Sequence, residues 1–187
     1  MSTLYILAGP NGAGKTTASK FLLPEVFHTN IFINADEIAM QINPLHVEAA
    51  AIQAGRIMLQ EIDKSLSEKK TFAIETTLAT RSYLNLVKKA QVIGYEVALF
   101  FLYLPSSDMA KQRVALRVYK GGHNIPGDIV ERRYVSGIKN LFEFIRIVDQ
   151  WYIYENSVTP PELIAEGEFE KLPLIHNFDL WEKLKTI

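Results

Sequence analysis

Short apolar runs alternate along this chain with longer segments in which apolar residues recur every three or four positions. The runs have the length of β-strands, and they lie at residues 4–8, 31–36, 71–75, 96–104 and 151–154. This alternation predicts parallel strands joined by helices that cover both faces of a sheet. We therefore expect a three-layer α/β fold, with a mostly parallel five-stranded sheet flanked by helices.

Apolar stripes mark the helices between these strands. A short helix is expected over residues 17–23, a long one starts at Asn43-Pro44, and another follows Thr80. The buried face of the long helix carries Val47, Ala51, Ala54, Met58, Ile62 and Leu66. After the last strand, the composition predicts a turn at residues 159–161 and a terminal hairpin around residues 166–168.

Two further helices are separated by a break at Gly121-Gly122. The first begins at Ser107, and the second packs through Val130, Tyr134, Ile138, Leu141, Ile145 and Val148. The same periodicity places Arg132 on the solvent side and Arg133 beside the packed stripe. Because paired glycines allow the backbone to bend, we expect residues 107–135 to form a helical lid.

The most specific signal in the chain is the segment Gly-Pro-Asn-Gly-Ala-Gly-Lys-Thr-Thr at residues 9–17, which has the spacing of a phosphate-binding P-loop. Glycines let the backbone wrap an anion with its N–H groups pointing inward, and the N-terminus of the next helix attracts the same anion. The spacing predicts that Lys15 reaches the β- and γ-phosphates of a nucleotide and that the Thr16 hydroxyl ligates Mg²⁺. The expected nucleotide contacts are Gly9, Pro10, Asn11, Gly12, Ala13, Gly14, Lys15, Thr16 and Thr17.

Two carboxylates, Asp36 and Glu75, stand at the carboxyl ends of predicted strands, where ligands gather in open α/β sheets. Phosphoryl transfer to an alcohol needs a carboxylate that accepts the hydroxyl proton. We predict that Asp36 is this base, with a helix cap as its alternative role. Glu75 is expected either to contact substrate or to bond to a neighbouring loop. Thr77 is expected either to hydrogen-bond a substrate oxygen or to be an ordinary strand residue.

Four arginines surround the glycine break: Arg113, Arg117, Arg132 and Arg133. Guanidinium groups stabilise the charge of a transferring phosphoryl group, whereas a single arginine is more often a surface charge. We predict catalytic roles for Arg117 and for one of Arg132 and Arg133. Arg113 is expected to be a helix-surface or pairing residue.

Composition limits the remaining possibilities. The 187 residues are 48% hydrophobic and carry a formal net charge of −1, which fits one domain over residues 1–187 and indicates no nucleic-acid surface or polybasic anchor. The chain has no cysteine, and its longest apolar run, residues 97–104, is too short to span a bilayer. We expect a soluble, cytoplasmic protein without a membrane or nucleic-acid partner.

The histidines and the residues after the fifth strand are further candidates for a role in the site. The four histidines lack metal-ligand spacing, and only His123 lies in the expected lid, where a structural role is its simpler interpretation. Asn156 and Ser157, which follow the fifth strand, are candidates for contact with an adenine ring.

These segments together resemble the zeta toxin family of P-loop kinases, in particular its short, single-domain branch. The matching segments are residues 9–17, 34–36, 74–80, 94–97 and 117–133. Zeta toxins share their fold with nucleotide and shikimate-type kinases, and they phosphorylate the 3′-hydroxyl of UDP-N-acetylglucosamine or related UDP-sugars with ATP or GTP and Mg²⁺. The resemblance therefore implies a three-layer P-loop NTPase fold and a kinase acting on a small-molecule hydroxyl, with a protein antitoxin as a candidate partner.

The resemblance also implies roles for particular residues. Carried across by matching position, Lys15 binds the phosphates, Asp36 activates the sugar hydroxyl, Glu75 and Thr77 contact substrate, and Arg117 with Arg132 or Arg133 stabilises the transferred group. The chain departs from the family where Glu-Gly-Thr is Glu75-Thr76-Thr77 and where the usual arginine is Ala79. Because acceptor specificity resides in such loops, the identity of the acceptor stays open.

Two alternative functions are weaker. A nucleotide-binding ATPase or switch module without an acceptor would be favoured by a Leu-Ser-Gly-Gly-Gln-like signature, which the chain lacks. A polynucleotide end-kinase would need a basic groove, which the near-neutral charge does not indicate.

Overall fold

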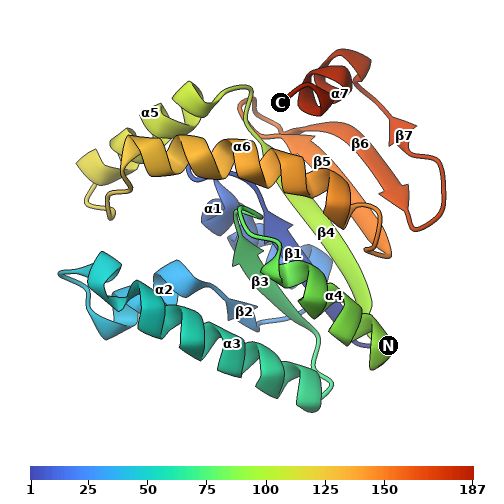
Figure 1. The fold of residues 1–187 in the computed structure, drawn as a ribbon, viewed down its shortest axis with the longest axis horizontal. Coiled ribbons are helices and arrows are strands. Elements are labelled where there is room, and N and C mark those ends of the chain that lie inside the picture. The colour runs from blue at the N-terminus through green and yellow to red at the C-terminus, as the bar shows by residue number, and fades with distance from the viewer.

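A computed structural model describes all 187 residues and contains one sheet of seven strands in the order β2-β3-β1-β4-β5-β6-β7 (Figure 1). The strands are β1 Thr3–Ala8, β2 Phe32–Ile33, β3 Phe72–Thr76, β4 Glu96–Tyr103, β5 Gln150–Glu155, β6 Glu162–Glu168 and β7 Leu174–Ile175. The first five pair in parallel, whereas β5-β6 and β6-β7 pair antiparallel. The α/β class and the mostly parallel sheet are confirmed. The count of five strands was wrong, because the residues after β5 add two strands.

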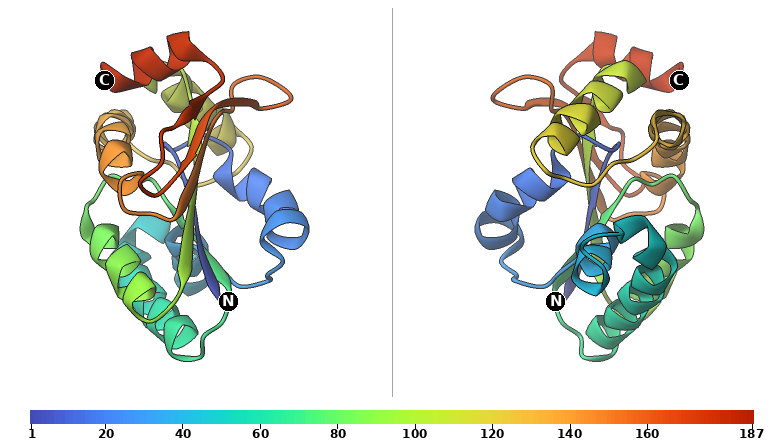
Figure 2. Two further views of the ribbon diagram at one scale, coloured as in Figure 1. Left: turned by 90° about the vertical axis from the view of Figure 1, so that its right-hand side faces the viewer. Right: turned by 90° about the vertical axis from the view of Figure 1, so that its left-hand side faces the viewer.

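Helices cover both faces of this sheet. They are α1 Lys15–Leu22, α2 Ala35–Ile42, α3 Ala51–Ser67, α4 Ser82–Val92, α5 Ser107–Tyr119, α6 Gly127–Phe144 and α7 Phe178–Lys185, with a π-helical turn η1 at Leu23–Phe27 and a 3-10 turn η2 at Val47–Ala50. Figure 2 shows α1 and η1 on one face of the sheet and α3, α4 and α6 on the other. None of the helices combines the length and apolar character that crossing a bilayer requires.

One hydrophobic cluster of 44 buried residues runs through the whole chain. Strand β4 is buried along nearly its full length, as expected of a central strand covered on both faces. On the α1 face, the Phe27 ring stacks on Tyr5 at a centroid distance of 4.1 Å. At the other end, Trp181 of α7 stacks on Trp151 of β5 at 6.0 Å, so the C-terminal helix shares the same core.

The second strand is shorter than predicted, and this moves Asp36 into a helix. Strand β2 ends at Ile33, and the Asn34 side chain accepts a hydrogen bond of 2.8 Å from the backbone N–H of Asp36. Asn34 is therefore the N-cap of α2, a role for which asparagine is strongly favoured. Asp36 lies in the first turn of α2 and is neither a strand residue nor the cap.

Three other predicted boundaries were also wrong. The helix expected from Asn43-Pro44 is the short turn η2 followed by α3, and the helix expected to reach Val148 ends at Phe144. The hairpin expected around residues 166–168 lies inside β6, where Gly167 pairs with Trp151. A Cβ at Gly167 would lie 2.5 Å from the Trp151 ring, so this glycine allows packing and does not mark a turn.

Helix α6 lies directly against the segment that follows β3. A Cβ added at Gly137 would collide with the carbonyl oxygen of Thr77, and the Asn140 side chain donates a hydrogen bond of 2.7 Å to the carbonyl of Leu78. Because Gly137 has no side chain, the two backbones can approach this closely. Helix α6 thereby fixes the position of Thr77.

We expect Gly137→Ala to lower the free energy of unfolding by about 1–3 kcal/mol, because the added methyl group forces α6 and the Thr77 segment apart. Urea or thermal unfolding measures this effect. The matched control is Gly55→Ala in α3, where an added Cβ meets nothing within 4 Å. That change is expected to stabilise the protein by about 0.5–1 kcal/mol. A Gly137→Ala protein as stable as the wild type would contradict the close contact.

Candidate active site

The loop between β1 and α1 depends on glycine for both its path and its packing. Gly9, Gly12 and Gly14 have φ angles of 139°, 79° and 83°, which residues with a side chain rarely adopt. A Cβ at Gly9 would collide with the Leu102 carbonyl oxygen of β4, and one at Gly12 would lie 2.9 Å from the Ala110 carbonyl oxygen of α5. The loop is therefore packed tightly between the sheet and α5.

The segment after β5 is hydrogen-bonded to this loop. The Asn156 side-chain amide donates a hydrogen bond of 2.6 Å to the carbonyl of Ala13. Arg113 of α5 in turn donates to the carbonyls of Asn156 at 2.9 Å and Ser157 at 3.4 Å. Asn156, considered from sequence as an adenine contact, uses its amide to hold the loop. Arg113, expected to be a helix-surface or pairing residue, uses its guanidinium group to hold this segment.

Lys15, the first residue of α1, is folded back beneath the loop. Its Nζ donates to the carbonyls of Gly9 at 2.9 Å and Pro10 at 3.0 Å, and it lies 3.7 Å from Oε1 of Glu75. Burial lowers the pKa of Lys15, while the carboxylates of Glu75 and Asp36 oppose that shift. The ammonium group is held in place by oxygen atoms on several sides.

Glu75, near the end of β3, joins three parts of the site. Its Oε2 accepts hydrogen bonds from the Thr16 hydroxyl at 2.9 Å and from the Asn34 side-chain amide at 3.0 Å, while Oε1 faces Lys15. Glu75 was expected either to contact substrate or to bond to a neighbouring loop. These hydrogen bonds are contacts of the second kind. Sequence reasoning assigned no role to Asn34, although asparagine directly after a strand is a recognisable helix cap.

Two cavities of about 230 Å³ each meet at these residues. The first lies over the loop and is lined only by polar residues and glycines, among them Thr16, Thr17, Arg113 and Arg117. The second lies beside the end of β3 and is lined by Thr77, Tyr83, Met58 and Arg133 among others. Four residues line both cavities: Asn11, Lys15, Asp36 and Glu75. The Asp36 carboxylate therefore stands where the two cavities adjoin.

The structure places the arginines around the glycine break in different surroundings. Arg117 lines the first cavity and Arg133 the second, whereas Arg132 is exposed on α6 and lines neither. The Thr77 hydroxyl, also in the second cavity, accepts a long bond of 3.4 Å from the backbone N–H of Ala79. Arg133 is thus the only arginine of the second cavity.

Two buried polar atoms beside the first cavity have no partner within the protein. They are Oδ1 of Asn11 and Nε of Arg117. Buried polar atoms are nearly always hydrogen-bonded, so each unpaired one calls for an explanation such as a missing ligand. Both residues line the first cavity, which therefore has the character of a ligand site.

The acidic groups of the site form a local negative field at the start of α2. Burial, followed by the charges of Glu75 and Asp36, raises the pKa of Glu37. No group of three or more His, Asp or Glu side chains is placed to hold a metal ion by itself. The Thr16 hydroxyl and the Glu75 carboxylate nevertheless offer adjacent oxygen donors, which suit Mg²⁺ carried in with phosphates and water.

Comparison with known proteins gives a family match and related folds. The model of the family described as "Zeta toxin" matches residues 2–159. An uncharacterized protein of Haemophilus influenzae is 36% identical over 126 residues, which cover 67% of this chain and 88% of the relative.

Two solved structures have the same fold at low sequence identity. One, from work on the PezAT chromosomal toxin-antitoxin system of Streptococcus pneumoniae, has a TM-score of 0.65 and 23% identity, covering 86% of this chain and 72% of the other. The AvrRxo1-ORF1:-ORF2 structure with ATP has a TM-score of 0.73 and 15% identity, covering 98% and 63%. Because the family match spans residues 2–159, and so includes every segment that lines the two cavities, this chain belongs to the zeta toxin family of kinase-like phosphotransferases.

Proposed function

We propose that the protein transfers the γ-phosphoryl group of ATP or GTP to a hydroxyl group of a small molecule. The observation that carries this proposal is the position of Asp36, whose side chain lines both cavities. A nucleotide bound over the loop and an alcohol bound in the second cavity would meet at this carboxylate. The acceptor we favour is a UDP-activated amino sugar such as UDP-N-acetylglucosamine, the substrate class implied by the family.

The first cavity suits the donor. Lys15 and the N-terminus of α1 would face the β- and γ-phosphates, and Arg117 would stabilise the charge on the transferred group. The Thr16 hydroxyl, with Glu75 next to it, would hold Mg²⁺, which neutralises phosphate charge when it is bound. These groups would accelerate phosphoryl transfer mostly by positioning the reactants and by electrostatic stabilisation.

The second cavity suits the acceptor. As the acceptor oxygen bonds to the γ-phosphorus and the bond to the β–γ bridging oxygen breaks, Asp36 would take the hydroxyl proton. The products are the phosphorylated acceptor and the nucleoside diphosphate. Arg133 and Thr77 would bind other polar groups of the acceptor. A guanidinium group there supports an acceptor that carries negative charge, such as the diphosphate of a nucleotide sugar.

A partner protein is a further part of the proposal. One structural neighbour comes from a toxin-antitoxin system. We infer that this chain also has a neutralising protein partner, and co-purification with the product of a neighbouring gene would test this.

We expect Asp36→Asn to reduce phosphoryl transfer about 100-fold or more, because the variant lacks the base, while ATP affinity changes little. Lys15→Ala is expected to abolish both binding and transfer. The assay incubates the protein with labelled ATP and a panel of nucleotide sugars, with mass detection of products. Glu37→Gln, at a residue that lines neither cavity, is the matched control and should keep near wild-type activity. Wild-type turnover in Asp36→Asn would refute the base, and acceptor-independent ATP consumption would favour the switch alternative.

Neighbouring residues Arg133 and Arg132 provide a second test of the acceptor cavity. We expect Arg133→Met to lower kcat/KM for the acceptor about 10- to 100-fold, the range for loss of one charged hydrogen bond. Arg132→Met should have little effect, because Arg132 is exposed and lines neither cavity. Steady-state kinetics at saturating ATP measure both variants. Equal losses in the two would exclude a specific role for Arg133.

The bond from Asn156 to Ala13 predicts an indirect effect on nucleotide binding. We expect Asn156→Ala to weaken ATP binding about 5- to 10-fold, because the loop loses one of its anchors and the Ala13 carbonyl loses its partner. Calorimetric titration with a non-hydrolysable ATP analogue measures the change. Asn85→Ala, at an exposed position on α4, is the control and should bind normally. Unchanged affinity in Asn156→Ala would show that the loop keeps its shape without this anchor.

A further inference from the structure

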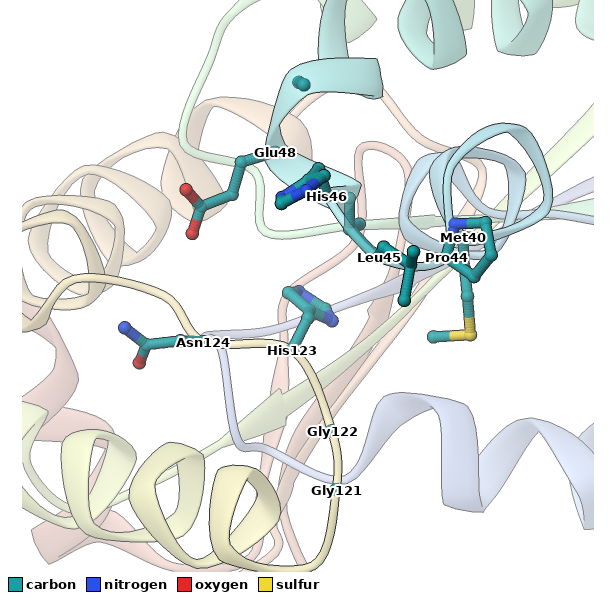
Figure 3. Close-up of a pocket in the computed structure, with 11 residues that line it drawn as sticks. Met40, Pro44, Leu45, His46, Glu48, Gly121, Gly122, His123 and Asn124 are labelled. Carbon is teal, nitrogen blue, oxygen red and sulfur yellow. The ribbon is translucent and has the colours of Figure 1, made fainter.

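A cavity of about 630 Å³, larger than the two described above, lies outside them. One wall is formed by residues 44–49 and the other by residues 121–124, which join α5 to α6 (Figure 3). His123 lines this cavity, with His46 and Glu48 on the facing wall. The same imidazole also reaches Arg117 and Asp36, two residues of the first cavity. His123 therefore links the connecting loop to the site of the proposed reaction.

Arg117 is held at one end by His123. Its Nη2 donates to the His123 carbonyl at 3.1 Å and lies 3.4 Å from Nε2 of the His123 ring. Gly122 supports this arrangement, because a Cβ there would lie 2.6 Å from Cγ of Arg117. With Nη2 committed to His123, the rest of the guanidinium group borders the first cavity, where phosphates would bind.

The same ring nitrogen of His123 also approaches the proposed base. Nε2 lies 3.7 Å from Oδ2 of Asp36. A neutral imidazole with its proton on Nδ1 can accept a hydrogen bond from Arg117 through Nε2. An imidazolium carries a proton on Nε2, so it can donate to Asp36 but can no longer accept from Arg117. The two contacts therefore require different states of Nε2: without a proton it accepts from Arg117, and with a proton it donates to Asp36.

We propose that His123 is a positioning residue for phosphoryl transfer: its neutral ring holds Arg117 toward the phosphates, and its protonated ring pairs with Asp36 instead. The inference rests on the proposed roles of Arg117 and Asp36. In the protonated state Arg117 loses the ring acceptor and keeps only its bond to the His123 carbonyl, and the base is occupied by an ion pair. The active enzyme therefore needs the neutral ring of His123, and it should lose activity as acid protonates that ring.

The first test compares pH profiles of kcat at saturating ATP and acceptor. His123→Gln offers a non-titrating amide oxygen to Arg117, so it should keep at least about a third of the kcat at pH 7.5 and lose less activity than the wild type at pH 5.5. His123→Ala should lower kcat at pH 7.5 about 10- to 100-fold with little change in acceptor KM. His46→Gln, in the same cavity, should keep the wild-type profile. An unchanged acid limb in His123→Gln, or wild-type kcat in His123→Ala, overturns the inference.

A second measurement does not depend on turnover. In protein labelled with ¹⁵N-arginine, the Nε signal of Arg117, identified through its loss in Arg117→Lys, should shift between pH 7.5 and 5.5. The shift should be absent in His123→Gln. If the wild type and His123→Gln show the same shift, the Arg117 signal does not depend on His123 and the inference is overturned, whatever the activity. Coupling in a protein that phosphorylates no acceptor would instead refute only the proposed function.

Discussion

The ammonium group of Lys15 and the carboxylate of Glu75 lie together beneath the phosphate loop, with 6% and 10% of their side chains exposed. Burying an unpaired charge costs several kcal/mol, so each group depends on the other and on its hydrogen bonds. The loop carbonyls bond to the ammonium group, while Thr16 and Asn34 bond to the carboxylate. This one pair therefore fixes the relative positions of the loop, α1, β3 and the start of α2.

The sheet explains how two residues 60 positions apart in sequence come to form this pair. Glu75 is opposite Leu7 in the parallel ladder of β3 and β1, so its side chain emerges beside the beginning of the loop. Asn34, the N-cap of α2, then places Asp36 in the first turn of that helix, at the same edge of the sheet. On the other side, the close approach of α6 at Gly137 keeps Thr77 and Arg133 around the neighbouring cavity. Backbone geometry thus brings the two cavities together around the pair of Lys15 and Glu75.

The sequence predicted the parts of this arrangement that depend on local pattern. The spacing of Gly9, Gly14 and Lys15, the apolar run of β4 and the packed stripe of α6 all correspond to observed elements. Periodicity also separated Arg133 from Arg132, in agreement with their exposure. Their roles in catalysis, like that of Asp36, stay predictions.

The remaining features depend on contacts that no local pattern contains. Strand β6 is antiparallel and carries Glu162, Glu166 and Glu168, so its polar residues suggested a turn and not a strand. The cap at Asn34 outweighed the strand signal of the residues around it. The bond between Asn156 and Ala13 joins residues 143 positions apart, and its partner is visible only in three dimensions.

That bond has a mechanical consequence. The segment after β5 is hydrogen-bonded to the phosphate loop through Asn156, and Arg113 bonds the same segment to α5. Arg117 lies one turn further along α5. Under the proposed function, a displacement of the loop by an incoming nucleotide would be passed through these hydrogen bonds to the helix that carries Arg117, so that binding of the donor would also shift the position of Arg117.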